Sequence, residues 1–137
     1  MRIILASKSG VRKDILKKNN IEFEIEHSNV DEDQAKESLI DTGADPFLIS
    51  KNLAELKSVK VSLKRPDEIV LGADSVVSLN NKLINKPKSR EEALKILKML
   101  NNSTHHLISS ICISKNGSMI WNHTDKSTLK MKKLNEQ

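Results

Sequence analysis

The chain has 137 residues, which suits one domain, and its single cysteine excludes a disulfide framework or a cysteine-ligated zinc site. Aromatic residues make up only 2%, which argues against nucleic-acid modules that stack bases on aromatic side chains. The net charge of +5 comes from lysines scattered along the chain, so we expect no nucleic-acid partner, whereas a phosphate-bearing small substrate stays open. No apolar run approaches bilayer length, and the apolar stretch at the N-terminus is too short for a signal peptide. We therefore expect a cytoplasmic protein with no membrane partner.

The first elements in chain order predict an α/β protein. Residues 2–6 form a short apolar run typical of a buried strand. A helix is predicted over 10–19, with Ser9 as its N-cap. Residues 21–26 alternate strictly between polar and apolar types, which indicates a half-exposed strand. The order strand, helix, strand is typical of α/β folds.

Two helices are predicted next, the first of them a weak one over 34–40. Asp45 and Pro46 mark a clear start for the second, because Asp caps a helix and Pro suits its first position. This helix is predicted to continue to Lys64. The residues expected on its buried face, at helical spacing, are Ile49, Leu53, Leu56 and Leu63.

The following segment predicts strands over 68–71 and 75–79, interrupted at 72–74, with a short return strand at 83–84. Ser89 begins a capping box, and the helix after it is predicted to end at Leu100. Its residues expected to face inward are Ala93, Ile96, Leu97 and Leu100.

The last elements are predicted to form a hairpin. Residues 106–115 read as a strand, Asn116 and Gly117 as a tight turn, and 119–121 as the partner strand. Local hairpins and crossover helices together predict an α/β fold with a mixed twisted sheet and flanking helices.

Asp74 is the leading candidate for a functional residue. It lies within the apolar stretch 69–77, where burial is expected, and a buried carboxylate needs a charged partner or a metal. The alternative is a bend at its small neighbours that lifts the carboxylate into water. We favour the functional interpretation.

Three other features carry less weight alone, since each is more often a solvated surface feature. The loop 7–10 and Arg12 suit phosphate, because a helix N-terminus offers free N–H groups, but the glycine spacing of a P-loop is missing. Lys57 and Lys86 lie where a helix end and a strand end could converge. The acidic triplet 31–33 offers oxygen ligands for Mg²⁺.

The histidines and the cysteine are expected to be bystanders. His105 and His106 are adjacent, so on a strand they point to opposite faces and cannot readily chelate one metal. Cys112 lies in an apolar run and is expected to be an inert core thiol.

Six segments taken together resemble the Maf family of nucleoside triphosphate pyrophosphatases, which is related in fold to the inosine triphosphatase group. Their order along the chain is more specific than any one of them. In that order they are residues 5–16 (LASKSGVRKDIL), 30–32 (VDE), 53–57 (LAELK), 72–77 (GADSVV), 86–87 (KP) and 100–105 (LNNSTH).

The resemblance implies hydrolysis of a nucleoside triphosphate to its monophosphate and pyrophosphate. It makes Asp74 the general base, and Asp74 and Glu32 the ligands of a divalent cation, Mg²⁺ or Mn²⁺. It also implies that five residues bind the substrate, all but Ser7 through its phosphates, and that the protein forms a homodimer. These five residues are Ser7, Ser9, Arg12, Lys57 and Lys86.

Two positions resemble those that bias substrate choice in this family. Val11 departs from the arginine of the branch that prefers pyrimidine nucleotides, whereas Ser75 keeps the hydroxyl of that branch's threonine. Pyrimidine nucleotides and modified nucleotides, such as methylated guanine nucleotides, therefore both stay open as substrates.

Residues 1–137 are expected to form a single Maf-like domain that lacks the family's usual C-terminal segment. A shortened pocket leaves a second hypothesis open. In it the protein is a catalytically impaired relative that binds nucleotide or a division-associated partner.

Overall fold

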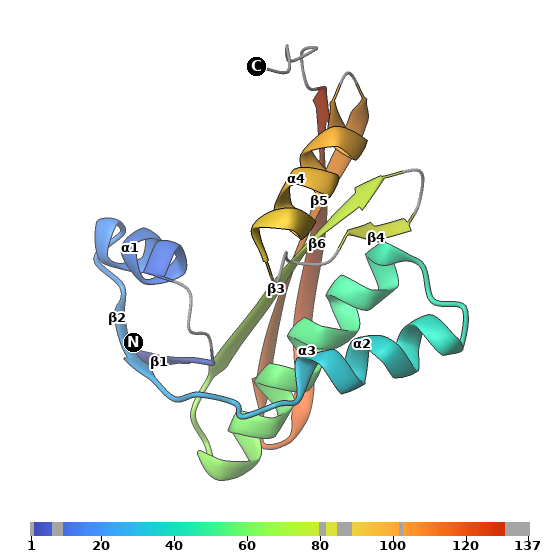
Figure 1. Cartoon of the computed structure of the whole chain (residues 1–137). Helices are drawn as coiled ribbons and strands as arrows, with labels where there is room; N and C mark the ends of the chain where they lie inside the picture. Colours follow the sequence, from blue (N-terminus) through green and yellow to red (C-terminus); the bar gives the residue numbers. More distant parts are fainter. Residues whose placement is uncertain (1, 7–9, 80–81, 85–88, 102, 131–137) are drawn as a thin grey trace.

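A computed structural model describes residues 2–6, 10–79, 82–84, 89–101 and 103–130. These residues form a six-stranded mixed sheet in the order β2-β1-β3-β5-β6, with β4 paired to β3 (Figure 1). Strand β1 runs parallel to β2 and β3, whereas β3, β5 and β6 are antiparallel neighbours. The strands are β1 (Arg2–Leu5), β2 (Glu22–Ile25), β3 (Val70–Leu79), β4 (Lys82–Ile84), β5 (Thr104–Lys115) and β6 (Ser118–Lys130). The predicted mixed α/β architecture is confirmed.

Three helices begin after a capping side chain, at Asp45 and Ser89 as predicted and at Asp31, which starts α2 earlier than the predicted range 34–40. Asp31, Asp45 and Ser89 each accept a hydrogen bond from the backbone N–H three residues further on. Helices α2 to α4 therefore start at the residue after a capping side chain. The four helices are α1 (Gly10–Lys18), α2 (Glu32–Asp41), α3 (Pro46–Lys64) and α4 (Arg90–Leu100).

Strand β3 is continuous, so the predicted interruption at 72–74 is wrong. Every residue from Val70 to Ser78 pairs with β5, including Gly72 and Asp74. The small residues, which suggested a break in the strand, instead allow α3 to pack closely on it. A Cβ on Gly72 would lie 2.6 Å from the carbonyl oxygen of Ala54, so glycine lets α3 lie against the strand.

Helix α3 packs on β3 and β5 through a row of small residues at four-residue spacing (Figure 1). The members of this row are Ser50, Ala54, Ser58 and Ser62, each 0% exposed. Of the four apolar residues predicted to face the core, Ile49 and Leu53 are buried, but Leu56 and Leu63 are 42% and 66% exposed. The prediction is wrong for Leu56 and Leu63 because α3 lies so close to the sheet that its row of small residues packs against the strands instead.

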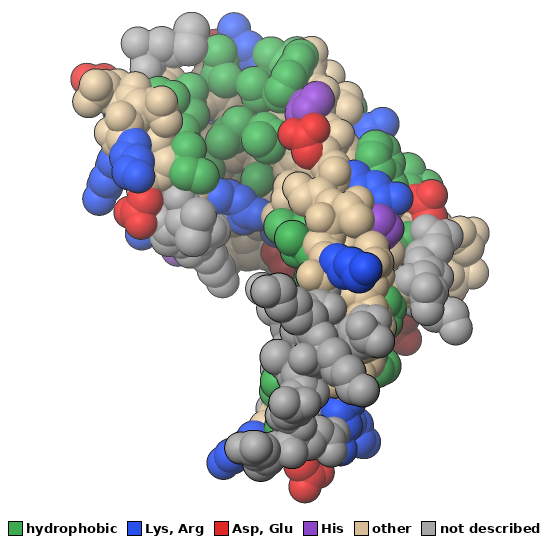
Figure 2. Space-filling model, turned by 90° about the horizontal axis from the view of Figure 1, so that it is seen from above, with side chains coloured by type: hydrophobic (Ala, Val, Ile, Leu, Met, Phe, Trp, Pro, Cys, Tyr) green, Lys and Arg blue, Asp and Glu red, His purple; other side chains and the backbone are tan. Residues whose placement is uncertain are grey.

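Several other apolar side chains lie at the surface. In α4 no residue is buried, and Leu97, predicted to face inward, is 46% exposed. Trp121 on β6 is 50% exposed and stacks on His123. Seen from above, apolar side chains gather on one part of the surface beside lysine and arginine side chains (Figure 2).

Cys112 is fully buried on β5, as predicted for a core thiol. Burial raises the pKa of this thiol to about 11, so it is protonated at neutral pH. No helix within the described ranges is both long and apolar enough to cross a membrane.

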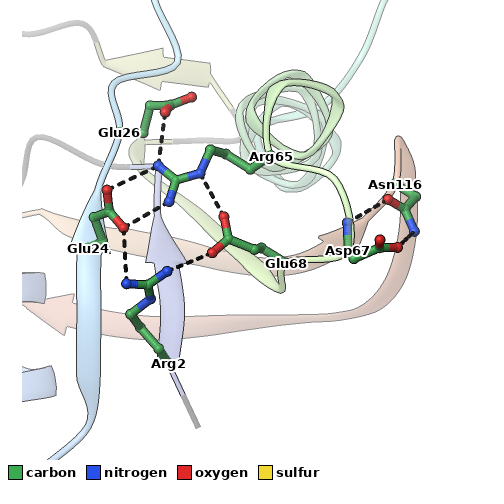
Figure 3. Close-up of polar contacts among 7 residues, drawn as sticks. All are labelled: Arg2, Glu24, Glu26, Arg65, Asp67, Glu68 and Asn116. Atoms are coloured by element: carbon green, nitrogen blue, oxygen red, sulfur yellow. Dashed lines mark hydrogen bonds and ion pairs between the residues drawn. The ribbon is translucent and has the colours of Figure 1, made fainter.

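The unit formed by β1, α1 and β2 lies to one side of the larger sheet (Figure 1). Among the described residues, its strand pairing with that sheet is limited to β1 and the first two residues of β3. Arg65, just after α3, reinforces this junction with hydrogen bonds to Glu24, Glu26 and Glu68, and Arg2 donates to Glu68 (Figure 3). The charged cluster thus joins the end of α3 to β2 and to the segment before β3.

This cluster predicts a pH-dependent contribution to stability. Hydrogen bonds from Arg65 hold the pKa values of Glu24 and Glu68 below the ordinary value of 4.5. A depressed carboxyl pKa contributes stability above the unfolded-state pKa, which is lost as the pH falls through the folded-state pKa. Arg65→Gln is therefore expected to lower Tm at pH 7 and to change it much less at pH 3.

Thermal unfolding of both proteins across this pH range checks the expectation. Lys64→Gln removes a positive charge one residue away that makes no ion pair within the described chain, so it is the matched control. An equal loss of Tm at pH 7 and pH 3 would contradict the electrostatic origin of the effect.

Candidate functional site

A cavity of about 1020 Å³ lies where the β1, α1, β2 unit meets the larger sheet. Strand β1 pairs with β3 only at Val70 and Leu71, and β4 pairs with it only from Val77 onward. Within the described residues, the edge of β3 between these points carries no neighbouring strand. Asp74 lies in the middle of this open stretch and lines the cavity.

Asp74 and Lys57 form a buried ion pair in this cavity. Each residue is 6% exposed, and Lys57 Nζ lies 3.2 Å from Asp74 Oδ1. The same ammonium donates to the carbonyl oxygen of Ala73 at 3.3 Å. Lys57 reaches this position from α3, which the small-residue row holds close to β3. The predicted burial of Asp74 and its need for a charged partner are both confirmed.

Glu32 brings a second carboxylate to the same ammonium. It lies in the first turn of α2, and its Oε1 is 2.6 Å from Lys57 Nζ. Lys57 therefore bridges two carboxylates that come from different elements, β3 and α2. Asp31, beside Glu32 in the acidic triplet, is the N-cap of α2.

Burial raises the pKa of the Asp74 carboxyl above its ordinary value, and Lys57 opposes this shift. Glu32 adds to the increase and Lys36 of α2 opposes it. The second oxygen, Oδ2, is buried and has no hydrogen-bond partner within the described chain. One side of the carboxylate is thus held by Lys57, and the other remains available to accept a proton or a bond.

Arg12 from α1 also lines the cavity. Its Nη2 donates to Ser75 Oγ at 3.4 Å, and Ser75 Oγ lies 3.0 Å from Ser109 Oγ on the neighbouring strand. The cavity therefore combines cationic groups at two places with a pair of hydroxyl groups between strands.

The structure brings together five of the residues singled out from the sequence, namely Arg12, Glu32, Lys57, Asp74 and Ser75. The others fall outside what is described. Ser7, Ser9 and Lys86 lie beyond the described residues, and Val11 belongs to α1 but its side chain is not described.

Other cavity residues were not predicted. Ser109 and the segment 27–29 line the cavity without belonging to any recognised motif. Ser109 reaches the site through the pairing of β5 with β3, whose register places it opposite Ser75. That register depends on long-range packing, so no local signal identifies it.

A second cavity, of about 560 Å³, lies near the start of α3 and includes Asp45, His106 and Lys126. Its carboxylate already caps α3 by accepting from the N–H of Leu48 at 2.8 Å. This cavity therefore offers a weaker case for catalysis than the one that holds the Asp74–Lys57–Glu32 cluster.

Comparison with known proteins identifies relatives along the whole chain. The family of Maf-like proteins matches residues 2–137. A nucleoside triphosphate pyrophosphatase from Pelagibacter ubique is 64% identical over 132 residues, which are 96% of this chain and 68% of that protein. A 7-methyl-GTP pyrophosphatase from Brucella abortus is 33% identical over 134 residues, 98% of this chain and 67% of its own length. The chain thus spans about two thirds of these relatives.

Solved structures agree on the fold. A HAM1 protein from Coxiella burnetii superposes with a TM-score of 0.60 at 13% identity, covering 93% of this chain and 70% of that one. A dITP/XTP pyrophosphatase from Mycobacterium abscessus gives a TM-score of 0.57 at 13% identity, covering 95% and 74%. The fold likeness agrees with the resemblance to the inosine triphosphatase group, and the sequence match shows that the chain belongs to the Maf family.

Proposed function

We propose that this protein hydrolyses a nucleoside triphosphate to the monophosphate and pyrophosphate. The observation that carries the proposal is the buried Asp74 carboxylate in a large cavity, held by Lys57 on one oxygen and unpartnered on the other. Its pyrophosphatase relatives from Pelagibacter ubique and Brucella abortus support the same chemistry.

Asp74 is the proposed general base. A water molecule splits the anhydride between the α- and β-phosphates, and Asp74 Oδ2 accepts its proton. Burial raises the pKa of the Asp74 carboxyl, which makes its ionised form a stronger base than an exposed aspartate. Lys57 fixes Oδ1, so the free oxygen is held in one orientation.

Cationic side chains are proposed to bind the phosphates. Lys57 and Arg12 line the cavity from different elements and supply positive charge on two sides. Ser9 and Lys86 stay predicted phosphate ligands from the family resemblance, and Ser7 stays a predicted substrate-binding residue. A triphosphate needs such charge because its own negative charge increases as the anhydride breaks.

Asp74 and Glu32 fit a divalent cation such as Mg²⁺ or Mn²⁺. Mg²⁺ is commonly held by one or two carboxylates together with substrate phosphates, and Asp74 Oδ2 has a second lone pair for the cation besides the one that accepts the proton. No group of three or more acidic, histidine or cysteine residues suited to a metal exists within the described chain, so substrate oxygens would complete the ligand set. When bound, the cation would neutralise phosphate charge and polarise the phosphoryl group.

Val11 and Ser75 are the proposed determinants of substrate choice, with pyrimidine and modified nucleotides as the substrate classes. The 7-methyl-GTP pyrophosphatase from Brucella abortus is among the relatives, so a methylated guanine nucleotide belongs in the test set. A homodimer stays a prediction from the family resemblance, and a cytoplasmic location stays a prediction from the sequence.

Incubating the full chain with Mg²⁺ and a panel of nucleoside triphosphates tests the proposal. We expect pyrophosphate and monophosphate in equal amounts from at least one nucleotide, and loss of this turnover when a chelator removes the cation. Nucleotide binding without turnover of any panel member would reject the enzyme and favour the alternative of a nucleotide-binding relative.

A further inference from the structure

The cavity lining differs in chemistry between the two faces of strand β3. Successive residues of a strand point to opposite faces, so Asp74 faces α3 and Ser75 faces the other side. The charged cluster of Lys57, Glu32 and Asp74 thus lies toward the α3 face. On the other side the lining includes the apolar residues Leu71 and Ile111, which share the strand face of the two hydroxyl groups. The charged side has two carboxylates and one ammonium, so it suits phosphates once a divalent cation is bound there, and the apolar side suits a base.

Ser75 and Ser109 are directly opposed across β3 and β5, with their hydroxyl oxygens 3.0 Å apart. A guanidinium can only donate, so Ser75 Oγ accepts from Arg12. Ser75 has one proton of its own, and its other hydrogen-bond partner in the described chain is Ser109 Oγ. Ser75 Oγ keeps a second lone pair, so either serine can donate in this contact; when Ser75 donates, the bonds run from Arg12 to Ser75 and on to Ser109.

With Ser75 as the donor, the Ser109 proton is left to be donated into the cavity. Within the described residues, the hydroxyl of Ser109 has no partner other than Ser75. Ser109 also lies on the same strand face as Ile111, two residues further on, which lines the cavity and is 38% exposed. A hydroxyl donor next to an apolar side chain can hydrogen-bond to the edge of a base that packs on that side chain.

We propose that Ser109 is a specificity-determining residue that donates a hydrogen bond to a carbonyl oxygen of the bound base. The inference rests on the proposed pyrophosphatase function and deepens it. A keto group on the base would accept the last hydrogen bond in the series that runs from Arg12 through Ser75 to Ser109. A base with an amino group there could only donate to the remaining lone pair of Ser109 Oγ, which would leave the Ser109 proton without this acceptor and weaken binding relative to the keto base.

The test compares UTP with CTP, which carry a carbonyl and an amino group respectively at position 4 of the same ring. In Ser109→Ala, the ratio of kcat/KM for UTP to that for CTP is expected to fall by roughly tenfold, the value of one hydrogen bond. Ser109→Thr keeps the hydroxyl and is expected to restore the ratio. The inhibition constant of inorganic tripolyphosphate, which has no base, should stay unchanged.

Ser114→Ala is the matched control. It removes a hydroxyl from the same strand, where Ser114 bonds to Ser58 in the core, away from the cavity. An unchanged UTP to CTP ratio in Ser109→Ala, or the same change in Ser114→Ala, would overturn the proposal. A change confined to the ratio of UTP to dUTP would also overturn it, because the contact would then be to the sugar.

Failure of the proposed function has a different signature, in which the parent protein releases no pyrophosphate from any nucleotide. The same variants are then compared by calorimetric binding of UTP and CTP. A preference for UTP that falls in Ser109→Ala and returns in Ser109→Thr supports the role of Ser109 in recognition, and its absence rejects that role.

Discussion

Replacing Asp74 by Asn is expected to lower the rate of pyrophosphate release by about 10³-fold, within the range that a general base contributes. The amide has nearly the same shape and can still accept a hydrogen bond from Lys57, but it cannot take a proton from water at neutral pH. Nucleotide binding should persist, because the cationic side chains of the cavity are retained. Steady-state kinetics and calorimetry on the same preparation separate the two effects.

The comparison needs a control for the loss of one negative charge. Asp125→Asn makes the same chemical change on β6, where the side chain is 75% exposed and pairs with His123. Its activity should equal that of the parent protein. If Asp74→Asn retains activity within about twofold of the parent, within the noise of such comparisons, Asp74 is not the base. Denaturant unfolding checks that both variants remain folded.

Part of this site could be predicted from the sequence, Asp74 from its local surroundings and Glu32 and Lys57 from the order of the family motifs. Asp74 is a carboxylate within an apolar strand, and a buried charge requires a partner. Glu32 follows a capping aspartate at the start of a helix, and Lys57 lies in a recognisable helix motif. Motif order then suggested that these segments meet, and the structure places all three side chains in one cluster.

The side of α3 that packs on the sheet could not be predicted in the same way. Hydrophobic spacing ranks Leu56 and Leu63 above serine for burial, whereas the structure buries Ser58 and Ser62. Which row of a helix faces a sheet depends on how closely the two approach, and that depends on residues far along the chain such as Gly72. The same limit applies to Ser109, whose place opposite Ser75 follows from strand register.

Gly72→Ala is expected to cost about 3 kcal/mol of unfolding free energy, at the upper end of typical overpacking effects. The added Cβ would lie 2.6 Å from the carbonyl oxygen of Ala54 and 2.8 Å from both Cβ and N of Ser58. Two of these contacts are to backbone atoms, so a change of rotamer cannot relieve them. Helix α3 must therefore move away from β3, or the strand must bend.

This displacement should also reach the site, because α3 carries Lys57 and β3 carries Asp74 two residues from the substitution. We expect kcat to fall by more than tenfold in the fraction that remains folded, while KM changes less, since the base loses its orientation. Kinetics well below Tm, with the folded fraction measured by circular dichroism, separate this effect from simple unfolding.

Gly43→Ala is the matched control for this experiment. Gly43 has a φ of +84° and no atom within 4 Å of an added Cβ, so alanine there meets backbone strain without crowding. It should lose about 1 kcal/mol of stability and keep the parent kcat. Equal losses of kcat in both variants would show that stability alone governs activity. A fall confined to Gly72→Ala would instead show that the close contact of α3 with β3 sets the geometry of Lys57 and Asp74.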